Sequence, residues 1–261
     1  IQEVLESKHI PYTGSGISAS RLAMNKVESK DIFRRNNILT PDYLVVSAEQ
    51  SVSEITKVVK NLKLPVITKP VSNGSSIGIS IIKEYIGIID AIEHTGSYSE
   101  EILVEECIEG RELAVSVLND KALPVIEIKT ATGIYDYDAK YKSDKTQYIV
   151  LASAAESSGT TLSHAVYNRV QELAVRAHNS LGCRAFSRVD MILNKDDEIY
   201  VLEVNTIPGF TERSLLPKAA AAANISFSEL CNSIVNAAGK HTFIPEQVVR
   251  ADIHDNDIAR I

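Results

Sequence analysis

The sequence predicts an α+β fold of two subdomains, and three observations lead to this class. Two runs rich in Val, Ile, Leu and Tyr flank a short polar run, which is typical of a β-hairpin. A second pair of short strands flanks a Gly/Ser loop, and apolar residues recur at helical spacing in two longer segments. We expect 13–105 to form the smaller subdomain and 106–238 a larger antiparallel sheet with helices packed on it. The segments behind these observations are 51–62, 65–70, 79–83, 161–181, 188–193 and 199–204.

The composition is ordinary for a folded protein and excludes some partners. The 261 residues are 44% hydrophobic and 23% charged, with a formal net charge of −7. No nucleic-acid partner is expected, because no basic stripe with interleaved aromatic residues occurs. Three widely spaced cysteines without metal or disulfide spacing favour a reducing compartment. No transmembrane span or signal peptide is evident, so we expect a cytoplasmic protein with no membrane partner.

The first part of the chain is expected to contain two helical segments separated by a turn. Residues 1–8 look like the end of a helix and the chain does not begin with Met, so we expect 1–12 to be the remnant of a preceding N-terminal region. After a turn at 13–16, an apolar stripe predicts one helix that runs through Lys26. Lys26 falls on the flank of this stripe, where a lysine is usually only solvated. The stripe consists of Ala19, Leu22, Ala23 and Val27.

The Gly/Ser loop at 73–78 follows a strand that ends on Lys69. The loop is not a P-loop, because the G-x-x-x-x-G-K-[ST] spacing is absent and no helix follows it. Its backbone N–H groups could still wrap a phosphate as a flexible flap. The alternative is a plain hairpin turn, and Lys69 at its entrance favours the phosphate interpretation.

The remaining elements alternate strands, one long polar segment and helices. The polar, Tyr-rich segment 130–147 carries Lys140 and Tyr141 in its middle, and loops of this length inside compact domains are often functional. Residues 239–261 form a polar C-terminal tail of uncertain structure. Strands are expected at 43–46, 102–106, 112–118 and 122–129, and helices at 161–181, 214–223 and 226–238.

The hairpin at 188–204 places candidate metal ligands together. With its turn centred between Asp196 and Asp197, Asp190 lies opposite Glu203. The same register sets Arg188 opposite Asn205 on the same face. Directly opposite carboxylates lie about 5 Å apart and repel each other, which suggests a bound cation, and all-oxygen ligands suit Mg²⁺. The alternative is an exposed hairpin face with solvated charges.

Several short motifs occur together in one order. They are PYTGS at 11–15, KP at 69–70 with GSSIG at 74–78, YDYDAKY at 135–141, RVD at 188–190, EVNT at 203–206, PGFT at 208–211 and SL at 214–215. With this ordered set, which extends over roughly 1–238 and is far more specific than any single motif, the chain resembles the D-alanine–D-alanine ligase family of the ATP-grasp superfamily. The resemblance implies an ATP-grasp fold, with ATP held between the sheets of two α+β subdomains.

The resemblance implies ATP-dependent joining of two D-alanines for peptidoglycan precursors. The carboxylate of the first D-alanine attacks the γ-phosphate of ATP, and the amine of the second displaces phosphate from the resulting acyl phosphate. By resemblance, two Mg²⁺ ions, with Mn²⁺ as a possible substitute, are held by Asp190, Glu203 and Asn205. Local positive charge for the nucleotide in this acidic chain is expected from Lys26 and Lys69 at the α/β-phosphates and Lys140 at the γ-phosphate.

The resemblance also implies the other roles in the site. Glu105 is the expected acceptor from the adenine amino group, the backbone near Ile108 contacts the ring, and Glu112 binds the ribose hydroxyls. Without the resemblance, Glu105 and Glu112 would be interpreted as exposed carboxylates at strand ends. Arg188 and the Gly209 N–H stabilise the tetrahedral oxyanion. The helix start at Ser214 and Leu215 binds the carboxylate of the second D-alanine, and Ser75 with Tyr141 ties the flap to the long loop against water.

One departure leaves alternatives open. The family has an N-terminal domain that supplies a Glu for the first D-alanine, and nothing in this chain replaces it, so we expect a truncation, a piece of a fusion or a paralogue. The alternatives to the ligase are a nucleotide-binding ATP-grasp fragment without ligase activity and another ATP-grasp carboxylate–amine ligase. A homodimer is expected only for the full-length protein, because the family often dimerises through the domain missing here.

Overall fold

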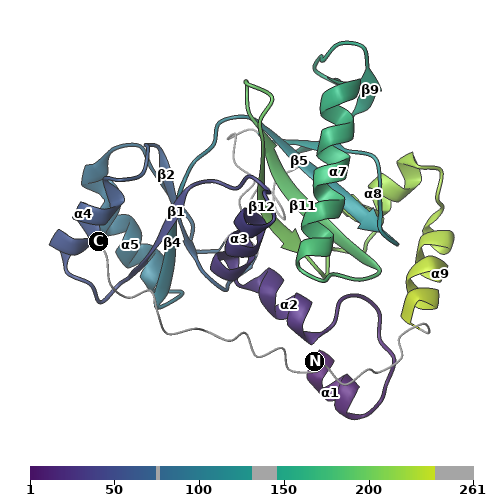
Figure 1. Cartoon of the computed structure of the whole chain (residues 1–261), viewed down its shortest axis with the longest axis horizontal. Coiled ribbons are helices and arrows are strands. Elements are labelled where there is room, and N and C mark those ends of the chain that lie inside the picture. Colours follow the sequence, from purple (N-terminus) through teal and green to yellow (C-terminus); the bar gives the residue numbers. More distant parts are fainter. Residues whose placement is uncertain (75–76, 131–145, 239–261) are drawn as a thin grey trace.

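The computed structural model describes residues 1–74, 77–130 and 146–238 and has the predicted α+β class (Figure 1). Within these residues the strands form a four-stranded sheet, here called the small sheet, a six-stranded sheet, called the large sheet, and one short separate pair. The sheets are antiparallel, and helices cover them on different sides. No helix in the described part of the chain is long and apolar enough to cross a membrane.

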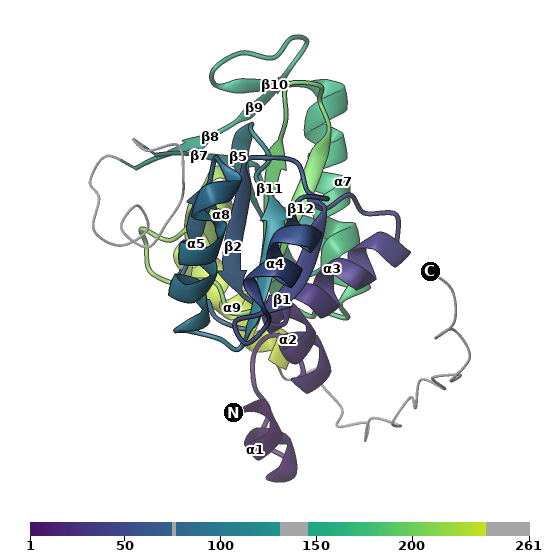
Figure 2. The same cartoon turned by 90° about the vertical axis from the view of Figure 1, so that its left-hand side faces the viewer.

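The small sheet has the strand order β1-β4-β2-β3. Its outer face packs on α4 and α5 through a buried cluster that includes Val46, Val66, Ile92 and Val104. Figure 2, viewed from this side, shows α4 and α5 in front of the sheet, so its other face is turned toward the rest of the molecule. The elements are β1 (Tyr43–Ser47), α4 (Val52–Val59), β2 (Val66–Pro70), β3 (Ser80–Ile82), η1 (Tyr85–Gly87), α5 (Ile88–Gly96) and β4 (Glu101–Glu106).

The large sheet has the order β12-β11-β5-β7-β8, and β6 pairs with β5. Odd-numbered residues of β5, such as Val115 and Val117, pack with Val170 and Ala174 of α7. Even-numbered ones, such as Ala114, pack with α8 and α9 on the opposite face. The elements are β5 (Arg111–Leu118), β6 (Lys121–Ala122), β7 (Ile126–Lys129), β8 (Gln147–Val150), β9 (Ala152–Ala154), β10 (Thr161–Ser163), α7 (His164–Ser180), β11 (Phe186–Leu193), β12 (Ile199–Asn205), α8 (Leu215–Ala222) and α9 (Phe227–Ala238).

The single helix expected around Lys26 is two helices, and this expectation was wrong. After α1 (Gln2–Ser7), α2 (Ile17–Met24) ends at Asn25, whose extended backbone and side-chain oxygen begin α3 (Lys26–Arg35). The Asn25 oxygen accepts from the N–H groups of Val27 and Glu28, and such local capping competes with helix continuation. Lys26 is therefore the first residue of α3.

The packing of α2 and α3 also differs from the expected assignment to the small subdomain. Ala19 and Phe33 belong to the core beneath the large sheet, and both helices contact β12. By packing, these two helices go with the large sheet. The boundaries 1–12, 13–105 and 106–238 stay a prediction, and the tail 239–261 lies outside the described residues.

Two further expectations differ from the structure. The helix expected at 161–181 begins only at His164, because Thr161–Ser163 pairs as β10 with β9 and Ser163 caps the helix. The strand expected at 122–129 is interrupted between β6 and β7, where Pro124 lacks an N–H for the ladder. Helix α5 was not predicted, and it packs on the outer face of the small sheet.

Candidate active site

The face of the large sheet that carries the predicted ligands is set by strand register. Arg188 pairs with Asn205 and Asp190 with Glu203, as predicted from the hairpin. On the other side of β11, Ile192 pairs with Glu112 of β5. Directly paired residues share a face, and faces alternate along a strand. The predicted site residues of the large sheet therefore share one face, and these are Glu112, Arg188, Asp190, Glu203 and Asn205.

A β-bulge places Asp190 and Glu203 on the same face. The pairing near the turn, continued without the bulge, would not do so. Near the turn the pairs are Met191 with Val201 and Leu193 with Ile199, one residue out of step with the pairing at Asp190. The extra residue is Leu202, which opposes no partner of its own. Without the bulge, Asp190 would face Leu202 and Glu203 would point to the opposite face. The predicted register is thus confirmed at the ligands but wrong beside the turn.

Asp190 and Asn205 are both held by hydrogen bonds. Asp190 is 6% exposed, and both of its oxygens accept from Arg188, at 2.7 Å from Nε and 2.8 Å from Nη2. The carboxylate thus fixes the orientation of the guanidinium. The Asn205 side-chain oxygen accepts from the Ile207 N–H at 2.9 Å and bends the chain after β12. Two opposed carboxylates and an amide form an all-oxygen donor set, and this chemistry fits Mg²⁺. Among the described residues, no group of three or more His, Cys, Asp or Glu side chains is placed so that it could hold a metal ion.

The inner face of the small sheet carries the other predicted charges. Lys69 pairs with Leu103 and Glu105 pairs with Ile67, so Lys69 and Glu105 share the face opposite to α4 and α5. The Glu105 carboxylate makes an ion pair with Lys69. Glu105 is 1% exposed, so the alternative interpretation as an exposed carboxylate at a strand end does not hold for it. Its adenine-binding role stays a prediction.

Lys30, which sequence reasoning missed, is the second partner of Glu105. Its Nζ lies 2.8 Å from the other carboxylate oxygen and donates to Thr40 Oγ1 at 2.7 Å. Burial raises the pKa of Glu105, but the ammonium groups of Lys30 and Lys69 outweigh burial and lower it to about 2. One signal was present in the sequence, because Lys30 precedes the buried Phe33 by three positions and so shares its helix face.

Two interactions link residues near the small sheet to residues near the large sheet. Burial lowers the pKa of Lys69, but the carboxylates of Glu105 and then Glu203 outweigh it, so the net shift is upward. Lys69 on the small sheet is therefore within electrostatic reach of the candidate metal ligand Glu203 on the large sheet. Lys26 donates from Nζ to the Asn73 carbonyl at 2.6 Å and lies at the entrance of the Gly/Ser loop.

The connection between β4 and β5 holds the predicted base-contacting residue Ile108, which is half-buried. This connection approaches the end of β11 very closely at Gly110. A Cβ built on Gly110 would lie 2.2 Å from the Leu193 carbonyl oxygen, so only glycine fits without a backbone shift. The close approach fixes Ile108 and Glu112 relative to the large sheet.

The predicted oxyanion and acceptor positions are neighbours. A Cβ on Gly209 would meet Ser214 Oγ at 2.9 Å, so the Gly209 backbone lies against Ser214. Ser214 is the N-cap residue of α8, as predicted, but its hydroxyl makes no capping bond and instead accepts from the Thr211 N–H at 3.1 Å. The Leu215 side chain is buried in the core, so its backbone N–H is the group that can meet an anion.

Three predicted residues lie outside the described part of the chain, namely Ser75, Lys140 and Tyr141. Their roles and their proximity to the other residues stay predictions.

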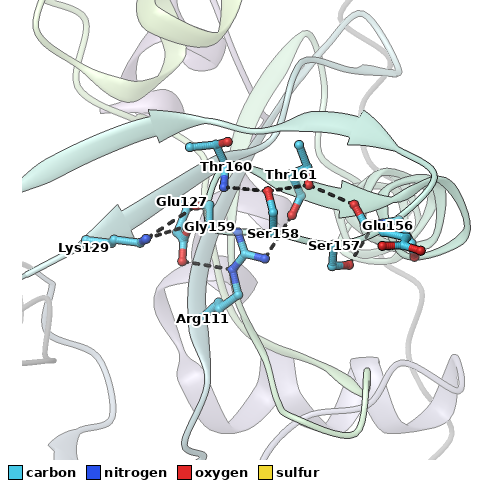
Figure 3. A network of polar contacts seen from close by, with 10 residues as sticks. Arg111, Glu127, Lys129, Glu156, Ser157, Ser158, Gly159, Thr160 and Thr161 are labelled. Atoms are coloured by element: carbon cyan, nitrogen blue, oxygen red, sulfur yellow. Dashed lines mark hydrogen bonds and ion pairs between the residues drawn. The ribbon is translucent and has the colours of Figure 1, made fainter.

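Strand β7 precedes the segment that holds Lys140 and Tyr141, and a polar network links β7 to neighbouring residues (Figure 3). Arg111 donates through Nε and Nη2 to both oxygens of Glu127, at 3.0 and 2.9 Å. Its Nη1 also donates to the Thr161 carbonyl at 3.2 Å. Lys129, the last residue of β7, reaches the Gly159 carbonyl at 3.5 Å. These contacts fix the end of β7 against the connection that leads to β10.

A cavity of about 570 Å³ lies away from the predicted site. It opens between the β5–β6 turn, the connection before β11 and α9, and Asp120 and Arg184 are among its lining residues. Behind Asp120 lies the fully buried ring of His178, whose Nδ1 is 2.7 Å from Ser187 Oγ. None of the predicted site residues lines this cavity.

Comparisons with known proteins agree with this geometry. Residues 32–236 match the family model described as D-ala D-ala ligase C-terminus. A D-alanine–D-alanine ligase of Nitrosomonas europaea is 41% identical over 241 residues, which covers 92% of this chain and 75% of that protein. One of Bordetella petrii is also 41% identical and covers 91% of this chain, which spans 71% of it.

Solved structures show the same similarity. The D-alanine–D-alanine ligase of Bacillus anthracis complexed with ATP has a TM-score of 0.75 and 32% identity, covering 91% of this chain and 73% of that one. The VanG D-Ala:D-Ser ligase of Enterococcus faecalis has a TM-score of 0.79 and 31% identity, covering 91% of this chain and 68% of that one.

Proposed function

The chain belongs to the D-alanine–D-alanine ligase family, and from this premise we propose that it performs the ATP-dependent joining of two D-alanines. The product is D-alanyl-D-alanine for peptidoglycan precursors. One observation carries the proposal for this chain. Arg188, Asp190 and Glu203 share a face of the large sheet, and Lys69 of the small sheet is within electrostatic reach of Glu203. A polyphosphate between these groups meets a cation on one side and metal ligands on the other.

In the first step, a carboxylate oxygen of one D-alanine forms a bond to the γ-phosphorus of ATP, and the bond to the ADP oxygen breaks. Lys69 and Lys26 hold the phosphates, and Lys140 neutralises the transferring phosphoryl group. Asp190, Glu203 and Asn205 would hold two Mg²⁺ ions, or Mn²⁺ in their place. When bound, the ions neutralise charge on the phosphoryl oxygens. Glu105, Ile108 and Glu112 bind the nucleoside.

In the second step, the amine of the other D-alanine attacks the acyl carbon, loses a proton and displaces phosphate. Asp190 holds Arg188 by two hydrogen bonds, and this fixes the guanidinium for the developing oxyanion. The Gly209 N–H is the second donor. Ser214, packed against Gly209, and the Leu215 N–H at the start of α8 bind the carboxylate of the attacking D-alanine. Ser75 and Tyr141 close the flap and protect the acyl phosphate from water.

We test this function by a coupled assay of ADP release with ATP, Mg²⁺ and D-alanine, followed by chromatography of the product. D-Alanyl-D-alanine is the expected product. D-Serine is included as a second acceptor, because a D-Ala:D-Ser ligase is among the similar structures. ATP binding that depends on Asp190 and Glu203 but yields no dipeptide would refute ligation by this chain and leave the nucleotide-binding alternative. We further propose a cytoplasmic location and a homodimer for the full-length protein, on the family resemblance.

A further inference from the structure

Lys30 occupies an environment that a lysine rarely enters. Its side chain is 1% exposed, and lysines are almost never fully buried unless they are paired. The ammonium group has a carboxylate oxygen of Glu105 at 2.8 Å, the Thr40 hydroxyl at 2.7 Å and the Tyr43 ring centre at 5.6 Å. Burial lowers the pKa of Lys30, and the Glu105 carboxylate opposes this shift. The 2.8 Å distance makes Glu105 the charge partner of this buried ammonium group.

The three charged groups Lys30, Glu105 and Lys69 do not balance. Two ammonium groups contact one carboxylate, so the cluster keeps one net positive charge. Lys30 and Glu105 are sealed at 1–2% side-chain exposure, whereas the Lys69 side chain is 15% exposed. The surplus charge therefore reaches solvent through Lys69. With Glu105 and Lys69 alone, the pair would be neutral and would attract an anion only weakly.

The open member of the cluster points toward the site. Lys69 lies at the end of β2, directly before the Gly/Ser loop, and the Glu203 carboxylate raises its pKa. Lys30 itself lies on α3, which packs on the large sheet, while Glu105 and Lys69 belong to the small sheet. The cluster thus joins the two subdomains at the predicted phosphate position.

We propose that Lys30 is a positioning residue for nucleotide binding, which neutralises Glu105 so that the charge of Lys69 remains available to the phosphates of ATP. This inference rests on the proposed function, because it takes ATP as the anion. Lys30 touches neither the nucleotide nor a reacting atom and acts only through Glu105 and Lys69. A purely structural role, in which the ion pair only ties α3 to the small sheet, is the competing explanation.

The two explanations differ in which ligand loses affinity. We measure dissociation constants of the 261-residue chain for ATP by calorimetry and for adenosine, which lacks phosphates, by competition. Lys30→Met keeps most of the side-chain volume but removes the charge. It should weaken ATP binding at least tenfold and change adenosine binding less than twofold. Lys30→Arg should keep ATP affinity within threefold. Arg34→Met is the matched control, because Arg34 stacks on the same Tyr43 ring from the same helix but its ion pair is with the exposed Asp42.

A double variant separates charge balance from lost contacts. Lys30→Met/Glu105→Gln again leaves Lys69 with an unopposed charge. Because Glu105 is also the predicted adenine acceptor, the readout is the ratio of ATP affinity to adenosine affinity, in which a lost adenine contact cancels, and this ratio should return to within threefold of the wild-type ratio. A ratio that stays as low in the double variant as in Lys30→Met overturns the proposal. If Lys30→Met does not fold, the double variant is compared with the wild type alone, and a ratio more than threefold below the wild-type ratio overturns the proposal. Equal losses for ATP and adenosine in Lys30→Met also overturn it. Failure of the wild type to bind ATP refutes the proposed function instead.

Discussion

The small and large sheets present opposite ion sets to the site. Beside the small sheet, Lys69 of β2 and Lys30 of α3 share the one carboxylate of Glu105, and the cluster is almost sealed from solvent. On the large sheet, one guanidinium meets Asp190 while a second carboxylate, Glu203, lies directly opposite. The first set therefore has a cationic surplus and the second an anionic one. In the proposed function, the phosphates of ATP meet the cationic set and a divalent cation meets the anionic set.

The largest expected effect on turnover comes from neutralising Asp190 or Glu203. Asp190→Asn and Glu203→Gln should each lower kcat by roughly a thousandfold, since metal-assisted charge neutralisation contributes several kcal/mol to such reactions. Steady-state ADP release with Mg²⁺ measures this effect. Asp196→Asn, an exposed carboxylate in the turn of the same hairpin, is the control and should keep wild-type turnover. A loss below tenfold in both variants would remove these carboxylates from the metal site.

The next largest effect is expected from disrupting the close contact between the β4–β5 connection and the end of β11. Gly110→Ala should lower the free energy of unfolding by about 1–3 kcal/mol, because the new Cβ would lie 2.2 Å from the Leu193 carbonyl oxygen. Urea denaturation measures the change. Gly159→Ala is the matched control, since no atom lies within 4 Å of the added Cβ. Equal stability of the two variants would show that this contact is not tightly packed.

Acid should weaken the large subdomain before the ion set of the small sheet. Burial lowers the pKa of His178, so below its ordinary value of about 6.5 the unfolded chain binds a proton that the folded chain does not. Stability is therefore lost as pH falls below about 6.5, by at most about 1.4 kcal/mol per pH unit. Glu105 has its pKa lowered to about 2, so its contribution is fully present above about 4.3 and is lost only as pH falls toward 2.

Unfolding curves in urea between pH 7 and pH 5 check this order. His178→Gln should flatten the pH dependence in this range, whereas the exposed His164→Gln should leave the slope of the wild type. An unchanged slope in His178→Gln would assign the acid sensitivity to another group.

The smallest effects compare two serines at helix starts. Ser51 forms a capping box with Glu54 on α4, so Ser51→Ala should cost about 1 kcal/mol of stability and leave the KM for D-alanine unchanged. Ser214 makes no capping bond on α8, so Ser214→Ala should cost less than about 0.5 kcal/mol. It should instead raise the KM for D-alanine about tenfold, as for a lost hydrogen bond to a carboxylate. Thermal unfolding and steady-state kinetics give both quantities, and the reverse pattern would contradict the role of Ser214.

Local sequence patterns determined much of this protein. Period-two alternation around a polar turn predicted that Arg188, Asp190, Glu203 and Asn205 share one face, and this is confirmed, although the pairing at these residues also depends on the bulge at Leu202. Apolar spacing predicted α4 and most of α7, and a helix was predicted over 214–223, where α8 lies. These features depend on residues close in the chain, whose backbone and side-chain preferences act over a few positions.

Only the tertiary structure decided the bulge at Leu202 and the burial of Lys30 and Glu105. The bulge depends on how β12 meets β11 beyond the turn. The burial of Lys30 depends on Glu105, which lies on a strand 75 positions later. A lysine and a glutamate read singly in sequence look like solvated surface charges, because the partner that makes their burial favourable is supplied only when distant segments pack together.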